Sequence, residues 1–150
     1  YRPMIENVTW YLGGHSTQSA TAEAFYGYER GTTVSSGRPT ETTGYIGLMY
    51  PSDYGYSVLS SSCARTTNLG SYNNATCAGQ SWMYGQGYEW TITPPSSTSD
   101  GVFFVSNNGY LYSNNANFGY AARPVLYLDS SVYVIDGTGT QSDPYIIGMG

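Results

Sequence analysis

The sequence predicts an α+β fold in which one or two short N-terminal helices pack against a small, antiparallel, loop-rich β-sheet. Short β-type runs separated by turn residues fill positions 88–147, and one helix-type segment stands near the start of the chain. With 150 residues, the chain has the length of a single domain, residues 1–150, and can bury a sizeable core.

The first half of the chain contains two strand-type segments and a short helix-type segment. Residues 3–12 predict a helical turn followed by a strand, which ends at a pair of glycines. Residues 44–50 (GYIGLMY) predict a buried strand. Residues 52–60 then predict a short helix with Ser52 as its N-cap.

Residues 19–29 (SATAEAFYGYE) form the best helix candidate. Ser19 or Thr21 can act as the N-cap, because a hydroxyl side chain accepts a hydrogen bond from an exposed backbone amide of the first turn. The spacing i, i+3, i+4 places three apolar side chains on one face, which we expect to pack inward. These are Ala22, Phe25 and Tyr26.

The second half of the chain is rich in strand signals. The Asn108-Gly109 step between FFV and YLY is a strong hairpin signal, because these residues adopt the positive φ angles that tight turns need. Further strands are predicted at 125–128, 132–135 and 145–147, and the last two flank a glycine-rich loop.

Charge is scarce in this chain. Charged residues make up 10% of it and aromatic residues 16%, so solubility must depend on Ser, Thr, Asn and Gly. All five basic residues are arginines, and the net charge is −5. The absence of lysine excludes Schiff-base catalysis and Lys–Asn isopeptide crosslinks. Because phosphate contacts need clustered Lys and Arg, we expect no nucleic-acid partner.

Cys63 and Cys77 lie fourteen positions apart in a polar stretch. A disulfide would close a loop of about 15 residues and contribute on the order of 3 kcal/mol; two buried free thiols are the alternative. We favour the disulfide, because the composition is typical of extracellular proteins, in which disulfides persist. No apolar run reaches the roughly 20 residues of a membrane span. For an exported protein, we expect a targeting segment to have been removed.

No catalytic centre is evident, and we expect a non-enzymatic protein without a cofactor. His15, the single histidine, has no recognisable triad around it and is interpreted as a loop residue. Asp136 and Asp143 border a glycine-rich loop whose oxygens could bind calcium. The alternative, which we favour, is that these carboxylates cap the turns of a hairpin loop.

Arg123 precedes Pro124 at the head of the most apolar predicted strand. A role in binding is one interpretation of this arginine. We favour a partly buried ion pair or contacts with backbone carbonyls that tie strand ends together, with Asp53 or Asp129 as a plausible partner of the ion pair.

Tyrosine and tryptophan give the strongest functional signal. They stand among Gly, Ser and Asn, the composition of antibody-like contact loops, in which Tyr offers a large and rigid contact area. The alternative is that these rings build the core and line the sheet, since Tyr suits strands. The candidate ligand-binding residues are Trp82, Tyr84, Tyr88, Trp90, Tyr112 and Tyr120.

Five motifs, in order along the chain, resemble one family of secreted proteins. They are residues 4–14, 28–32 (YERGT), 47–56 (GLMYPSDYGY), 90–94 (WTITP) and 123–128 (RPVLYL). They are similar to the soluble part of pilin-like surface proteins of Gram-positive gut bacteria, in which a prepilin-type signal and an apolar helix precede such a domain. The resemblance implies a structural or adhesive role at the cell surface, with self-association into a filament or binding to a surface partner or glycan.

The C-terminal half has a looser resemblance to C-type-lectin-like domains, including the formylglycine-generating enzyme group. The order of Trp90, the Asn-Gly hairpin and the segment 123–128 carries it. This resemblance implies a lectin-like module that binds carbohydrate or a host protein through Tyr- and Trp-rich loops. Calcium-mediated sugar binding is not implied, because the Glu-Pro-Asn and Trp-Asn-Asp signatures are absent. A glycan-acting enzyme is a remote alternative, because the carboxylates stand outside any telling motif.

Overall fold

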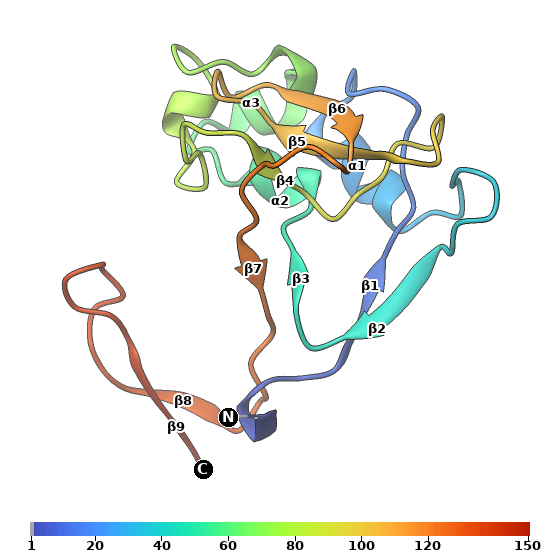
Figure 1. Ribbon diagram of the computed structural model, residues 1–150. Coiled ribbons are helices and arrows are strands. Elements are labelled where there is room, and N and C mark those ends of the chain that lie inside the picture. Colours follow the sequence, from blue (N-terminus) through green and yellow to red (C-terminus); the bar gives the residue numbers. More distant parts are fainter. Residues whose placement is uncertain (1) are drawn as a thin grey trace.

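The computed structural model describes residues 2–150 and has the predicted α+β architecture. Three short helices and a three-stranded sheet form a head, two strand pairs form a stem below it, and a hairpin projects from the base (Figure 1). The helices are α1 (Ala22–Glu29), α2 (Pro51–Tyr56) and α3 (Ser61–Thr66), with 3₁₀ turns η1 (Arg2–Met4), η2 (Leu69–Ser71) and η3 (Ala78–Gln80). The strands are β1 (Val8–Tyr11), β2 (Glu41–Gly44), β3 (Gly47–Leu48), β4 (Glu89–Trp90), β5 (Gly101–Val105), β6 (Leu111–Asn115), β7 (Pro124–Val125), β8 (Val132–Asp136) and β9 (Ile146–Met149).

All pairs between these strands are antiparallel. In the head, β5 lies between β4 and β6. In the stem, β1 pairs with β2, and β3 pairs with β7. The second pair joins a strand from the first third of the chain to one from its last third. The hairpin joins β8 to β9 alone. None of the helices in the described part of the chain has the length and apolar character needed to cross a membrane.

Helix α1 begins where the sequence predicts. Thr21 is its N-cap, and the Thr21 hydroxyl accepts a hydrogen bond of 3.3 Å from the backbone amide of Ala24. Ala22 and Phe25 are fully buried. The prediction for Tyr26 was wrong: its ring is half-exposed and lies against the Arg30 guanidinium, 3.5 Å from the ring centroid. The next buried position on this face of α1 lies one turn after Phe25 instead.

That later position is Glu29, a fully buried carboxylate that joins α1 to α2. Its Oε1 accepts a hydrogen bond from the Ser52 amide at 2.8 Å, and its Oε2 accepts one from the Ser52 hydroxyl. Arg30 lies 3.2 Å from Oε2. Ser52 therefore stands inside α2 rather than capping it. The N-cap is Tyr50, whose amide donates to the Asp53 carboxylate.

The head is closed by a disulfide between Cys63 and Cys77, as the sequence predicts, with Cα atoms 5.7 Å apart. It links α3 to the start of η3, and both cysteines belong to the buried core. Beside it, Gly109 has a φ of +94° in the predicted β5–β6 turn. A Cβ there would lie 2.1 Å from that of Ala78, so only glycine fits.

Trp10 organises the stem. Its indole nitrogen donates to the Gly44 carbonyl at 2.9 Å, and its ring packs on that of Tyr127, 5.6 Å between centroids. A Cβ at Gly47 would lie 2.7 Å from the indole ring. The predicted strand 44–50 is consequently broken into the end of β2 and the short β3, because the backbone bends around this ring.

Candidate binding cleft between α2 and β7

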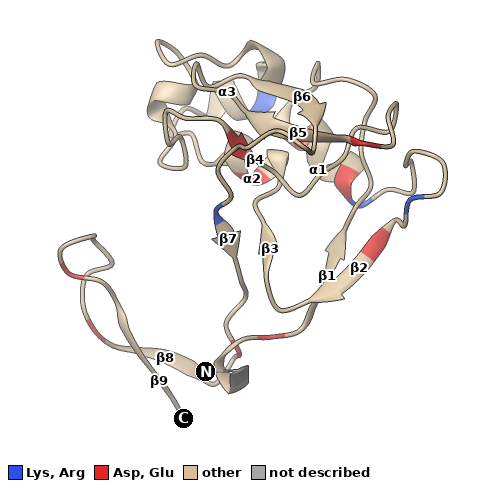
Figure 2. Ribbon diagram, in the orientation of Figure 1, with Lys and Arg blue, Asp and Glu red and all other residues tan. Residues whose placement is uncertain are grey.

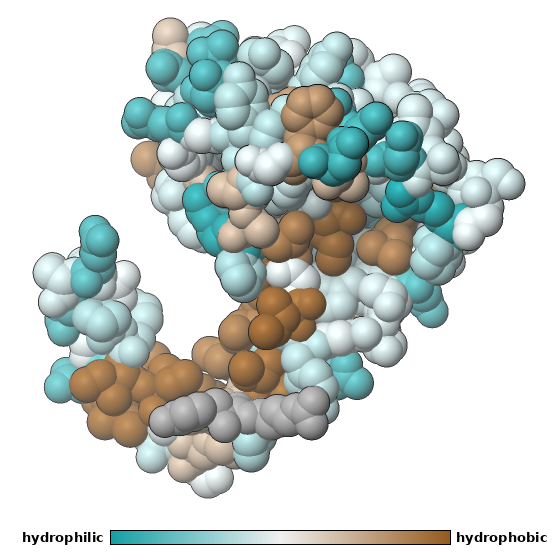
Figure 3. Space-filling model, in the orientation of Figure 1, coloured by the Kyte–Doolittle hydropathy of each residue, from teal (hydrophilic) through white to brown (hydrophobic). Residues whose placement is uncertain are grey.

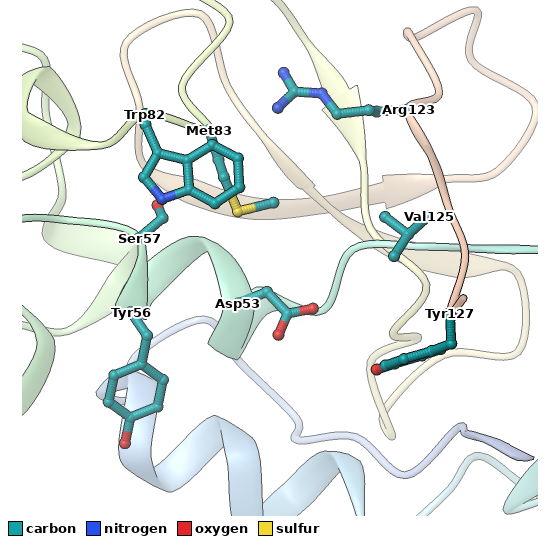
Figure 4. A pocket seen from close by; sticks show the side chains of 8 residues that line it. All are labelled: Asp53, Tyr56, Ser57, Trp82, Met83, Arg123, Val125 and Tyr127. Carbon is teal, nitrogen blue, oxygen red and sulfur yellow. The ribbon is translucent and has the colours of Figure 1, made fainter. Parts of the chain in front are cut away.

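A cleft of about 440 Å³ opens between α2, the segment that carries Trp82, and the chain around β7 (Figure 4). This volume falls within the range of about 300–1,000 Å³ that is usual for small-molecule sites. Most of its walls are aromatic or aliphatic, with an acidic and a basic group between them. The lining residues are Asp53, Tyr56, Ser57, Trp82, Met83, Arg123, Val125 and Tyr127.

Trp82 forms one wall and is 78% exposed, although the chain beneath it is fixed. Val58 and Ser81 form an isolated β-bridge, and the hydroxyl of Ser81 shares a hydrogen bond with that of Ser57. The Ser81 hydroxyl also accepts a hydrogen bond of 3.2 Å from the amide of Met83, which is buried. An exposed indole thus stands on a rigid support.

The opposite wall comes from the segment of β7. Arg123, Val125 and Tyr127 alternate along it and point into the cleft from the side facing Trp82 (Figure 4). Pairing of Val125 with Gly47 holds this segment against β3. The packing of Tyr127 on Trp10 sets the orientation of the tyrosine ring. Both walls are therefore preorganised.

Arg123 forms an ion pair, as predicted, but its partner is Glu89 in β4 rather than Asp53 or Asp129. The Arg123 guanidinium lies 3.0 Å from Glu89 Oε2. Asp129 instead accepts hydrogen bonds from Ser131, and Asp53 caps α2 while lining the same cleft as Arg123. The sequence could not reveal this partner, because the pair depends on a long-range contact. The parallel bridge between Glu89 and Ala121 places β4 beside the segment that leads into β7.

Glu89 is a buried carboxylate with incomplete hydrogen bonding. Its Oε1 atom has no hydrogen-bond partner among the described residues. Burial raises the pKa of Glu89, and the charge and hydrogen bond of Arg123 act in the opposite direction. Gly85 lies over the pair: a Cβ there would stand 3.3 Å from the guanidinium. The next residue, Gln86, has a φ of +57°, so this covering loop is strained.

We expect Arg123→Met to lower the free energy of unfolding by about 2 kcal/mol, because it leaves the Glu89 charge buried and unpaired. The figure is below the full cost of breaking a buried pair, since the Arg123 side chain is 39% exposed. Denaturant unfolding measures it. Adding Glu89→Gln should restore more than half of the loss, and Arg65→Met, at an exposed arginine, should change little. Equal losses in all three variants would contradict this interpretation.

The six aromatic residues that the sequence singles out fall into three places. Trp82 lines the cleft. Tyr84 is half-buried against the core, and its hydroxyl donates to the Asn107 carbonyl. The other four join a sheet-face cluster on and beside β4, β5 and β6 with Phe104 and Phe118, in which Tyr120 stacks on Tyr88 at 5.0 Å between centroids. Those four are Tyr88, Trp90, Tyr112 and Tyr120.

The sheet-face cluster uses many of its rings against one another. Tyr120 contacts Trp90 at 4.6 Å and Phe104 at 4.7 Å between centroids, and Phe104 is nearly fully buried. A ring whose faces are covered by other rings has less surface left for a ligand. By contrast, Trp82 keeps most of its surface accessible. The cleft is therefore the better binding site of the two.

The acidic loop between β8 and β9 has the geometry of capped turns. Asp143 accepts hydrogen bonds from the amide and the hydroxyl of Thr138, and Asp136 accepts one from the Gly137 amide. Within residues 2–150, no group of three or more His, Cys, Asp or Glu side chains is placed to hold a metal ion. His15 stacks on Tyr28 at 4.3 Å between centroids, and its Nδ1 contacts the Thr17 carbonyl.

Comparisons with protein-family models, with curated proteins and with solved structures found no match for this chain.

Proposed function

We propose that this chain is a non-catalytic, adhesive domain of a pilin-like bacterial surface protein, and that it binds a neutral saccharide in the cleft between α2 and β7. The observation that carries the proposal is Trp82, a largely exposed indole on a fixed support, which faces Arg123 and Tyr127 across the cleft. The disulfide supports an oxidising compartment, where such bonds persist.

The groups that line the cleft suit a sugar. Indole and phenol rings offer flat apolar faces to the C–H groups of a pyranose, and they bury area at low entropic cost. The Asp53 carboxylate can accept hydrogen bonds from hydroxyl groups, and the Arg123 guanidinium can donate them. One acidic and one basic group together favour a ligand without net charge over an anionic one.

Glycan-array screening followed by titration tests the proposal. We expect Trp82→Ala to weaken binding by roughly tenfold or more, the loss typical of an aromatic anchor. Tyr112→Ala is the matched control, because Tyr112 is half-exposed but belongs to the sheet-face cluster. Loss of binding in Tyr112→Ala alone would move the site to that cluster. Absence of any glycan ligand, with binding of a host protein blocked by Trp82→Ala, would replace the saccharide with a protein partner.

A further inference from the structure

The β8–β9 hairpin leaves the rest of the molecule and exposes apolar side chains on both of its faces. In Figure 1 it extends from the base of the stem, and in Figure 3 an open space separates it from the head while apolar side chains gather on it. Seven of its large apolar residues are roughly one-third to three-fifths exposed. They are Tyr133, Val134, Ile135, Tyr145, Ile146, Ile147 and Met149.

The strand register shows that both faces are apolar. Tyr133 pairs with Gly148, and Val134 pairs with Ile147, so neighbouring pairs point to opposite sides. Strands with continuous apolar runs, rather than alternating ones, are typical of sheets covered on both faces. A two-stranded hairpin alone in water is also marginally stable at best. The hairpin therefore needs a covering layer on each side.

A second apolar surface lies on the stem, formed by the segment that follows β7 and by the residue before β3. We call it the stem strip: Ile46, Leu126 and Leu128, which are 60%, 40% and 46% exposed. Leu126 and Leu128 flank Tyr127, whose ring packs on Trp10, so their own side chains point away from that contact. This segment runs along the side of the stem that looks toward the hairpin (Figure 1).

The chain cannot cover its own strip with its own hairpin in this arrangement, because a short turn fixes the hairpin's direction. The Asp129 carboxylate accepts hydrogen bonds from the Ser131 amide at 2.8 Å and from the Ser131 hydroxyl at 2.6 Å. The Asp129 amide donates to the Met4 carbonyl at the base of the stem, and the Val132 amide donates to the Asp129 carbonyl. The turn thus holds strip and hairpin apart.

We propose that two copies of this chain clasp each other, each inserting its hairpin between the stem strip and the hairpin of the other. The layers would then follow the order strip, partner hairpin, own hairpin, partner strip, which covers both faces of both hairpins. The exchange is reciprocal and closed by a twofold axis, as in most protein dimers. The hairpin's own charges, Asp136 and Asp143, lie at and beyond the end of β8, away from its apolar pairs (Figure 2).

The available area is comparable to that of a stable pair. The ten half-exposed side chains are together equivalent to about five fully exposed ones and offer roughly 750–1,000 Å² per copy, at about 150–200 Å² for each. A standard specific interface buries about 800 Å² per partner. An interface formed by the two hairpins alone would leave the stem strips uncovered and would bury only part of this area.

Sedimentation equilibrium of the full chain at micromolar concentrations tests the clasp, with an expected mass of twice 16.3 kDa. Ile135→Asp and Leu128→Asp should each raise the dissociation constant by roughly 100-fold or more, because each places a carboxylate in a dry apolar contact. Leu59→Asp is the control, since Leu59 is 87% exposed on the head. Circular dichroism verifies that each variant is folded.

Three results would overturn the clasp. A wild-type chain that sediments as a monomer would show that the hairpin needs no second copy. A dimer that withstands Leu128→Asp would show that the stem strip is not part of the contact. A series of masses above the dimer would also overturn the closed exchange and would indicate an open, head-to-tail association instead.

Discussion

One buried carboxyl group should lower the free energy of unfolding by about 3 kcal/mol as the pH rises from about 4.5 to about 7, and its contribution should be level above that range. This group is Glu29. Burial raises its pKa from 4.5 to about 7, although the hydrogen bonds from Ser52 and the charge of Arg30 act against the rise. In this window the unfolded chain has lost the Glu29 proton while the folded chain keeps it. The folded state binds more protons, so stability decreases with pH.

Glu29→Gln isolates this effect. The amide can accept from the Ser52 backbone and donate to the Ser52 hydroxyl, so the link between α1 and α2 is kept without a titrating group. We expect the variant to match the wild type near pH 4.5 and to be the more stable protein above pH 7. Glu23→Gln, at an exposed glutamate in the first turn of the same helix, should leave the wild-type slope intact. A slope that survives Glu29→Gln would assign it to another group.

Removal of the disulfide should cost about 3 kcal/mol, as the chain-entropy estimate for a loop of this length gives. The segment between the two cysteines contains polar turns, and without the bond the unfolded chain gains the freedom of that loop. Urea unfolding of Cys63→Ala/Cys77→Ala measures the loss.

Reduction of the wild type provides the control for the disulfide. A reductant should lower the stability of the wild type to about that of the double variant, and it should not affect the variant. If the double variant lost less than about 1 kcal/mol, the loop would be held by its other contacts. The hydrogen bond of the Tyr72 hydroxyl to the Gly55 carbonyl, at 3.1 Å, is one such contact.

Local signals predicted much of the secondary structure. The Thr21 cap, the hairpin at Gly109 and the pairing of Cys63 with Cys77 each depend on residues close together in the sequence. The division of residues 44–50 into two strands could not be predicted, because it is dictated by Trp10, which lies 34 positions before Gly44 in the sequence.

The cleft was harder to predict than the elements around it. Trp82 could be predicted as a binding residue because it stands in a Gly-rich segment. Glu89, by contrast, was missed as the partner of Arg123. The sequence did contain one signal for Glu89. It is a single carboxylate between two aromatic residues, Tyr88 and Trp90, as expected of a buried acid in a strand. Choosing it over Asp53 required knowledge of the bridge between Glu89 and Ala121.

The base of the stem determines how this domain would bear a mechanical load. There, residues 4–6 run antiparallel to residues 127–129: Ile5 bridges Leu128, Glu6 donates to the Tyr127 carbonyl, and Asp129 donates to the Met4 carbonyl. A force that pulls these two segments apart sideways loads their hydrogen bonds one after another, and a small force peels them. A force between a ligand held by Arg123 and Tyr127, on the β7 wall of the cleft, and the base runs along β7 instead and loads its bonds together. An adhesive contact through the cleft would therefore place tension on the molecule in its stronger direction.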